Sequence, residues 1–161
     1  MNKHKDLLDC CDGYFHRNEL KNHYPEPYSP TIYFLTRNNK IVYIGETGSP
    51  YTRFKQHTQK TPIYKEWDKV FFKTFDEYVK GIHLRYLESR AMTYLNEFTE
   101  YNRRVQKIGD HNENPFTASI LNEYLLRVQV EVLSWELTYE KEKNKEQREV
   151  ILYYQDLFDK Q

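Results

Sequence analysis

The stretch from Thr31 to His57 constrains the fold more than any other part of the chain. Two runs rich in β-branched and aromatic residues, Thr31–Thr36 and Ile41–Glu46, flank the short polar break Arg37–Lys40. Such runs suit a pleated sheet and the Asn-rich break suits a tight turn, so the pattern predicts a β-hairpin. Three residues that commonly end strands or begin helices, Gly45, Gly48 and Pro50, then end the second predicted strand and begin a helix.

The helix predicted after the hairpin, about Pro50 to Gln59, carries two side chains that suit phosphate chemistry. Arg53 and His57 are four residues apart, so they share one helix face. The hairpin places Tyr33 and Tyr43 near that helix. A guanidinium binds phosphate oxygens through paired hydrogen bonds, and an imidazole or a phenol can move a proton.

Length and charge favour a single domain with its own core and a basic N-terminal half. The chain has 161 residues and a formal net charge of zero, from 24 basic and 24 acidic side chains. Residues 31–73 hold eight Lys or Arg against three Asp or Glu, whereas residues 131–161 hold five against eight. This distribution suits a polyanionic partner, and ordinary scatter of surface charge is the alternative explanation.

The cysteine pattern and the hydropathy point to a cytoplasmic protein. Cys10 and Cys11 are adjacent, and neighbouring cysteines rarely meet the geometry of a disulfide. No Cys/His spacing typical of a metal site occurs. No apolar stretch is long enough to span a membrane, and no cleavable signal is evident.

Further elements are predicted on both sides of the hairpin. A strand is expected over Lys69–Phe75 and a helix over about Ile82 to Phe98, which makes the fold compact α+β. After a polar loop, a helix is expected over Ser119–Leu126, and strict alternation predicts a fourth strand from Arg127 to about Leu137. A final helix is expected over Tyr139–Phe158. Near the N-terminus, one face of a short helix is expected to hold five residues: Leu7, Leu8, Cys11, Tyr14 and Phe15.

Two triplets on the hairpin resemble the signature motifs of the GIY-YIG nucleases. They are Thr31-Ile32-Tyr33, with Thr31 where glycine is usual, and an intact Tyr43-Ile44-Gly45. Residues matching in order follow them: Arg53, His57, Glu88 and, more loosely, Asn102. The resemblance covers about residues 31–102. It implies a small core of β-hairpin, helix, strand and helix, preceded by an N-terminal arm (1–30) and followed by a C-terminal strand–helix extension packed on the core (103–161).

The same resemblance implies a metal-dependent endonuclease that hydrolyses phosphodiester bonds in DNA. Glu88 would hold Mg²⁺, with Mn²⁺ as the alternative, because hard cations take carboxylate oxygens. Arg53 would clamp the scissile phosphate with a planar fork. The remaining catalytic residues would be Tyr33, Tyr43 and His57, with further substrate contacts from Lys55, Gly45 and Asn102. Whether the DNA is duplex, branched or single-stranded stays open, as does a homodimer.

Each of these assignments has a plainer alternative. Glu88 can be an ordinary helix-surface carboxylate, with Glu149 as the competing metal ligand, and Arg53 a solvated charge. Some family members have a lysine after the second triplet, where this chain has Glu46, and this favours His57 as the base. The alternative functions are a non-catalytic nucleic-acid-binding module that keeps the GIY-YIG fold, or a protein-interaction domain.

Overall fold

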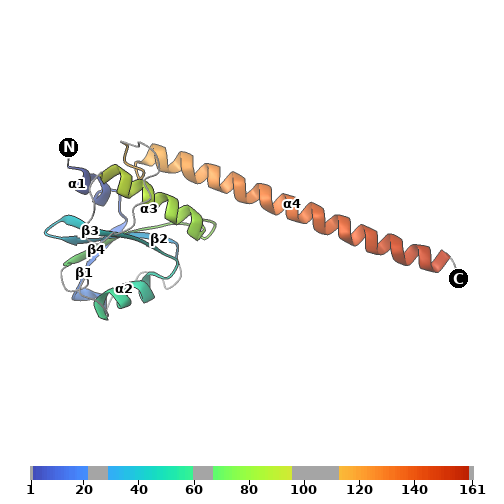
Figure 1. The fold of residues 1–161 in the computed structure, drawn as a ribbon, viewed down its shortest axis with the longest axis horizontal. Coiled ribbons are helices and arrows are strands. Elements are labelled where there is room, and N and C mark those ends of the chain that lie inside the picture. Colours follow the sequence, from blue (N-terminus) through green and yellow to red (C-terminus); the bar gives the residue numbers. More distant parts are fainter. Residues whose placement is uncertain (1, 22–28, 60–66, 96–112, 160–161) are drawn as a thin grey trace. The chain divides into compact units, whose positions relative to one another are not determined.

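The computed structural model describes residues 2–21, 29–59, 67–95 and 113–159, which form an α+β fold. The chain divides into two compact units, Met1–Glu123 and Tyr124–Gln161. In chain order the elements in Figure 1 are α1 (Lys3–Leu8), β1 (Gly13–His16), the 3₁₀ turn η1 (Glu19–Lys21), β2 (Thr31–Arg37), β3 (Lys40–Thr47), α2 (Pro50–Gln59), β4 (Lys69–Thr74), α3 (Gly81–Leu95) and α4 (Ala118–Asp159).

The described residues build one antiparallel four-stranded sheet with the strand order β1-β4-β2-β3. Its predicted hairpin is confirmed as β2–β3. Asn38 and Asn39 make the turn with φ values of 52° and 60°, a left-handed conformation that asparagine tolerates and that matches the strand twist. Because β2 pairs with β3 on one side and β4 on the other, Tyr33 lies opposite both Gly45 and Phe72.

Helices cover both faces of this sheet (Figure 1). Helix α2 packs on one face through Phe54, which shares a buried cluster with Tyr33 and Leu35. Helices α3 and α1 cover the other face over β2 and β3. The apolar face of α3 is buried at six positions: Leu84, Leu87, Ala91, Met92, Tyr94 and Leu95. The helix predicted over Pro50–Gln59, the strand from Lys69 and the helix from Ile82 are confirmed, although residues 96–98 lie outside the described residues.

The N-terminal residues form an edge of the sheet, and the single helix expected for them is wrong beyond Leu8. Tyr14 and Phe15 lie in β1, which pairs with β4. Tyr14 stacks on Phe71 with ring centroids 5.1 Å apart. An aromatic pair of this kind stabilises the pairing of two strands, so these residues form a strand and not a continuation of the helix.

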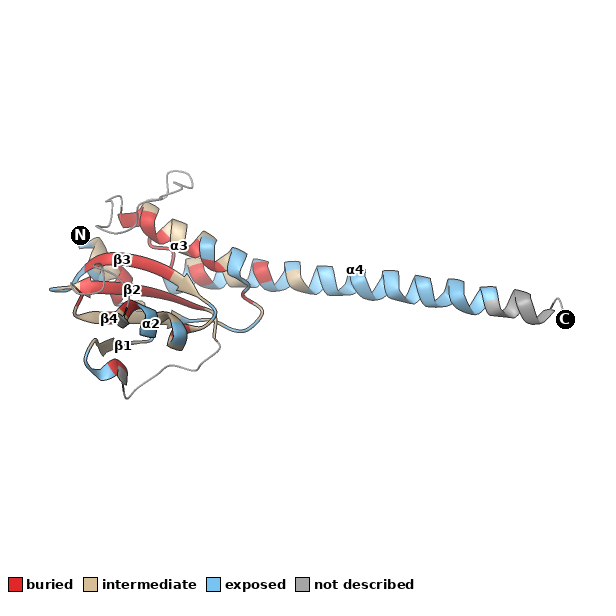
Figure 2. Cartoon of the chain, turned by 60° about the horizontal axis from the view of Figure 1, so that its bottom comes forward, coloured by how far each residue is buried: buried red, intermediate tan, exposed pale blue. Residues whose placement is uncertain are grey.

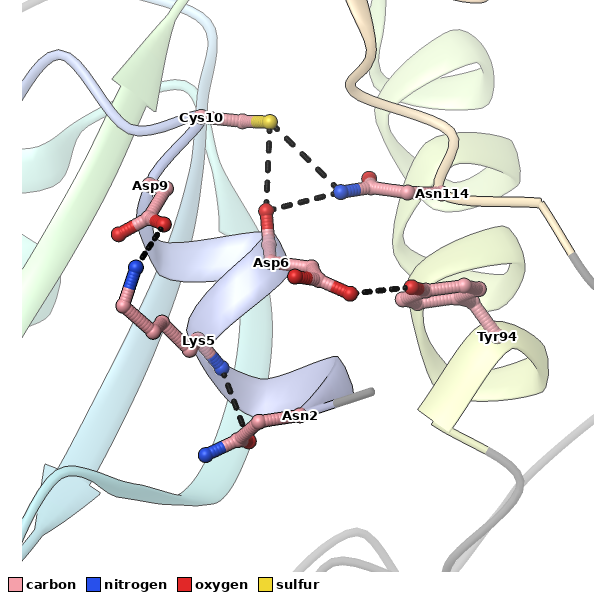
Figure 3. A network of polar contacts seen from close by, with 7 residues as sticks. All are labelled: Asn2, Lys5, Asp6, Asp9, Cys10, Tyr94 and Asn114. Atoms are coloured by element: carbon pink, nitrogen blue, oxygen red, sulfur yellow. Dashed lines mark hydrogen bonds and ion pairs between the residues drawn. The ribbon is translucent and has the colours of Figure 1, made fainter.

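Side-chain hydrogen bonds fasten α1 to distant parts of the first unit (Figure 3). Asp6 accepts a hydrogen bond on Oδ2 from the Tyr94 hydroxyl at 2.9 Å, and its backbone carbonyl accepts one from Asn114 Nδ2 at 2.8 Å. Asn2 caps the helix by accepting the backbone N–H of Lys5 at 3.2 Å. A six-residue helix is too short to be stable alone, so these contacts hold it in place.

The predicted strand from Arg127 to Leu137 is wrong, because one continuous helix, α4, spans residues 118–159. The alternation of Val128, Val130 and Val132 fits a period of two. However, Leu121, Val128 and Val132 are seven and four residues apart and therefore lie on one face of a helix. This helical spacing links the predicted strand to the helix predicted before it. The two helices expected on either side of the strand are the two ends of α4.

Two expectations drawn from composition can be compared with the described residues. Cys10 and Cys11 are both free thiols. No helix in the described ranges is long and apolar enough to cross a membrane.

Candidate active site

Tyr33 is the centre of the candidate site. It lies in the middle strand β2 and is fully buried. Its hydroxyl accepts a hydrogen bond from Arg53 Nε at 3.1 Å and is 2.7 Å from His57 Nε2. Burial, with a smaller contribution from Tyr43, raises the pKa of Tyr33 well above its ordinary value, although Arg53 opposes the shift. Tyr33 is therefore a neutral phenol at working pH.

Gly45 explains why the second triplet ends in glycine. It faces Tyr33 across the hairpin, where a Cβ atom would overlap the Tyr33 ring and hydroxyl. The same Cβ would lie 2.7 Å from Cε1 of Tyr43, closer than real side chains approach. The absence of a side chain at Gly45 lets both tyrosines stand side by side, with ring centroids 5.9 Å apart.

His57 is buried between the two tyrosines. Its side chain is 2% exposed, and its ring meets those of Tyr33 and Tyr43 edge-on, with centroids 5.3 and 5.5 Å apart. Burial, and secondarily the charge of Arg53, lowers the pKa of His57 to about 3. The imidazole is therefore neutral near pH 7, and it is a weaker base than an exposed histidine.

Arg53 connects this buried pair to the edge of the site. Its Nε donates to Tyr33, and its Nη1 donates to Gln56 Oε1 at 3.3 Å. The phenolic oxygens of Tyr33 and Tyr43 raise the pKa of Arg53 further, so the guanidinium stays charged. Because Nε is already engaged, a bidentate contact through that edge requires Arg53 to release Tyr33.

Glu88 brings a carboxylate from α3 into the same electrostatic network. Its pKa is raised to about 7, first by burial and then by the neighbouring charge of Glu46, while Arg53 and Arg85 oppose the shift. Two carboxylates that interact in this way repel each other, and a proton or a cation relieves the repulsion. A hard divalent cation binds through one or two carboxylates and keeps several waters, so Glu88 and Glu46 are the residues of the site whose chemistry suits one.

Within the described residues, no group of three or more His, Cys, Asp or Glu side chains forms a metal-binding cluster. A cation at Glu88 and Glu46 would thus be held by two protein ligands, with substrate oxygens and water completing its shell. Glu46 is the residue that the sequence reasoning treated only as a departure from the family. The signal that could have found it is its place directly after Tyr-Ile-Gly, at the end of β3.

The other predicted residues are placed as follows. Lys55 is exposed and its Nζ lies over the Tyr51 ring, 5.9 Å from the centroid. Thr31, which replaces the usual glycine, is buried in β2, and its hydroxyl donates to the backbone carbonyl of Ser29 at 2.9 Å. Glu149 is exposed in the second unit. Asn102 lies outside the described residues.

Comparisons with known proteins add no further assignment. No protein-family model, no curated protein and no solved structure matches the chain. The likeness to the GIY-YIG nucleases therefore depends on the motif residues quoted above. What the structure adds is that the buried Tyr33 and His57 and the half-buried Tyr43 and Arg53 contact one another, and that Glu88 interacts electrostatically with Arg53.

Proposed function

We propose that this chain is a metal-dependent DNA endonuclease of the GIY-YIG type that hydrolyses phosphodiester bonds. The observation that carries the proposal is the hydrogen-bonded group Arg53–Tyr33–His57 beside the carboxylates Glu46 and Glu88. It supplies a fixed cation and a neutral imidazole in one hydrogen-bonded group, and an acidic pair of which Glu88, on α3, interacts electrostatically with Arg53. These are the parts that phosphodiester hydrolysis needs.

Arg53 is the group that binds the scissile phosphate. Its charge is held at any working pH, and its planar guanidinium suits phosphate oxygens. Binding substrate through the Nε edge would release the Tyr33 hydroxyl. Tyr33 then becomes available to the attacking water.

Tyr33 and His57 together move the proton of that water. Arg53 can only donate, so the Tyr33 oxygen accepts from it and the phenolic proton is available to His57 Nε2, 2.7 Å away. As water gives its proton to the Tyr33 oxygen, Tyr33 gives its own to the neutral imidazole. Because the charge of Arg53 is one of the two causes that lower the pKa of His57, movement of Arg53 onto the phosphate favours this transfer. The raised pKa of Tyr33 argues for this relay and against a resting phenolate.

Glu88 and Glu46 are the residues that would hold Mg²⁺ or Mn²⁺. When bound, such a cation polarises a phosphoryl oxygen and screens the charge that develops on it. Glu88 must lose its proton to act as a ligand. With a pKa of about 7 it does so at and above neutral pH.

A nicking assay tests this proposal. Purified chain is incubated with supercoiled, branched and single-stranded DNA, each with Mg²⁺ and with a chelator. We expect cleavage that requires the metal and is abolished by Glu88→Gln, because the amide is neutral and binds cations poorly. Glu123→Gln, at an exposed position in the same unit, is the matched control and should cleave normally. Normal turnover by Glu88→Gln would overturn the assignment.

The burial of the relay favours a second candidate, a non-catalytic nucleic-acid-binding module. Tyr33 and His57 are 0% and 2% exposed, so water reaches neither unless Arg53 moves. This candidate predicts salt-sensitive DNA binding without cleavage by any variant. Both candidates predict a shallow salt dependence, because only about three to five phosphates would be neutralised, each adding roughly −0.9 to the slope of log K against log salt.

A further inference from the structure

Helix α4 exposes far more apolar surface than the rest of the described chain. Of the twelve large hydrophobic residues that are exposed among the described residues, ten lie on α4: Leu126, Val130, Leu133, Trp135, Leu137, Tyr139, Val150, Ile151, Leu152 and Tyr153. Figure 2 shows most of this helix in the colour of exposed residues. Single exposed leucines are ordinary, whereas a continuous row of them marks a surface that another molecule covers.

Part of this surface follows a heptad repeat. Leu126, Val130, Leu133 and Leu137 are spaced four, three and four residues apart, and each is more than half exposed. The same spacing continues without a break through polar positions to Ile151. We call this row the seam: Leu126, Val130, Leu133, Leu137, Glu140, Asn144, Gln147 and Ile151.

The length of the seam suits a coiled coil. From Leu126 to Ile151 it covers more than three heptads, with apolar residues from Leu126 to Leu137 and at Ile151 and polar residues at the three positions between them. At a rise of 1.5 Å per residue it extends over about 38 Å of helix. A strict seven-residue repeat keeps such a row facing one partner when two helices supercoil to the left.

Another apolar row on α4 is already covered in part. Leu121 and Val128 are buried, and Val132 is half-buried. The seam differs, because each of its apolar members is more than half exposed in the part of the chain that the structure describes. It is therefore the row left for an intermolecular contact.

We propose that the seam pairs with the same seam of a second copy of this chain in an antiparallel coiled coil. The seam is apolar at both ends and polar in the middle, so it complements its own reverse. In the antiparallel register Leu133 meets Ile151 of the second copy, and Leu137 meets Gln147. Glu140 meets Asn144 at the centre.

The polar centre selects this orientation over the parallel one. A parallel pair would place Glu140 against Glu140 of the second copy inside one core layer, where two carboxylates repel each other. The antiparallel pair gives Glu140 the amide of Asn144, which can donate a hydrogen bond. A polar residue at a single core position commonly fixes orientation and register in coiled coils.

A shallow groove on the first half of α4 supports the same partner. It is lined by six residues, namely Leu126, Arg127, Val130, Glu131, Ser134 and Trp135. In the antiparallel register the part of this groove from Glu131 to Ser134 faces the segment Val150–Tyr153 of the second copy. All four side chains of that segment are more than half exposed in the single chain, so each half of α4 has apolar surface to offer the other. The proposal is independent of nuclease activity.

The first test is the mass of the full chain in solution, by light scattering or sedimentation over a range of concentrations. We expect about twice the monomer mass of 19.8 kDa. Leu137→Asp should raise the dissociation constant of the dimer by at least about a hundredfold, because it would bury an unpaired charge in the seam. Tyr139→Asp is the control, since Tyr139 is 65% exposed on the same helix and lies in neither the seam, the groove nor the segment Val150–Tyr153. A monomeric wild type, or dissociation by Tyr139→Asp alone, would overturn the proposal.

The second test fixes the orientation by disulfide cross-linking. Leu133→Cys and Ile151→Cys chains are mixed, oxidised and digested, and the cross-linked peptides are identified by mass spectrometry, which separates them from any link through Cys10 or Cys11. An antiparallel pair gives a link between positions 133 and 151. Links between position 133 and itself would show a parallel pair and refute the register.

Discussion

The two units of the chain use their apolar residues in opposite ways. In Met1–Glu123 the sheet residues Ile32, Tyr33 and Phe34 are completely buried, and helices cover both faces. In Tyr124–Gln161 apolar residues such as Leu133 and Leu137 are more than half exposed. The first unit therefore closes its own core, whereas the second carries apolar surface that a single chain leaves in water. Burial, rather than hydrophobic content, distinguishes a core from a contact surface.

The contrast extends to the charged groups. In the first unit Arg53, His57 and Glu88 are held among buried side chains, and their surroundings shift each of their pKa values. In the second unit the charged residues between 140 and 149 are exposed. Perturbed titration of several neighbouring groups is typical of functional sites. Chemistry is thus expected of the first unit and assembly of the second.

The largest effect expected from this comparison is on folding. Leu35→Ala, at a residue that is 1% exposed, should lower the free energy of unfolding of the first unit by about 2–5 kcal/mol, because it opens a cavity in the core. Leu137→Ala makes the same change at a residue that is 63% exposed, and it should alter the free energy of unfolding by less than about 0.5 kcal/mol. Urea denaturation of dilute protein, followed by tyrosine and tryptophan fluorescence, measures both. Equal decreases in the free energy of unfolding for the two variants would contradict the distinction between a buried core in the first unit and an exposed apolar surface in the second.

Much of the first unit could be predicted because its signals are local. The hairpin has β-branched strands around an Asn-Asn turn, and the 50–59 helix follows turn residues directly. The cluster of Arg53 and His57 follows from four-residue spacing on that helix. These features depend on neighbours in the sequence, so the chain reveals them before any tertiary contact is known.

What the sequence could not provide depends on tertiary contacts or on ambiguous periods. The row Val128, Val130 and Val132 satisfies a period of two, and only the continuous helix decides against a strand. The four residues of β1 form a strand because β4 offers them an edge. The influence of Glu46 on Glu88 depends on packing of α3 against β3, which no spacing along the chain encodes.

A second prediction sharpens the contrast at the site. Arg53→Lys keeps the charge but loses the planar fork, so turnover of DNA should fall about a hundred- to a thousandfold, or about 3–4 kcal/mol. DNA affinity should change little by comparison, and the free energy of unfolding should fall only by the loss of one buried hydrogen bond, about 1–3 kcal/mol. Single-turnover nicking rates measure the effect, with Arg17→Lys, which lies over the Trp67 ring, as the control. Nicking rates within about threefold of wild type would contradict a role for Arg53 in binding the scissile phosphate and leave it only a structural role.

A third prediction separates the role of Tyr33 in packing from its role in proton transfer. Tyr33→Phe keeps the ring in the core but leaves Arg53 Nε and His57 Nε2 without their shared partner. Stability should fall by about 1–3 kcal/mol, because buried polar groups lose a hydrogen bond. Nicking should fall about a hundred- to ten-thousandfold if Tyr33 relays the proton. Tyr139→Phe, on the exposed surface of α4, should change neither quantity, and undiminished nicking by Tyr33→Phe would exclude the relay.

The smallest expected effect is the pH dependence that Glu88 contributes to stability. Its folded pKa of about 7 lies above the ordinary value of 4.5, so between these values the folded state binds more protons than the unfolded state. The free energy of unfolding must then fall as pH rises through that window. Glu88→Gln removes the titration. The variant should match wild type near pH 4.5 and be the more stable of the two at pH 8, with a chelator present throughout.

Glu131→Gln, an exposed position on α4, provides the control from the other unit. It removes one exposed carboxylate and so controls for the loss of a single negative charge. Adding Mg²⁺ at pH 8 should close the gap between wild type and Glu88→Gln, since a cation would relieve the repulsion between Glu88 and Glu46. The opposite outcome is that the free energy of unfolding of wild type rises relative to that of Glu88→Gln as pH rises in the presence of chelator. Glu88 would then be paired with a cationic side chain. Its carboxylate would then be a structural group with no vacancy for a metal.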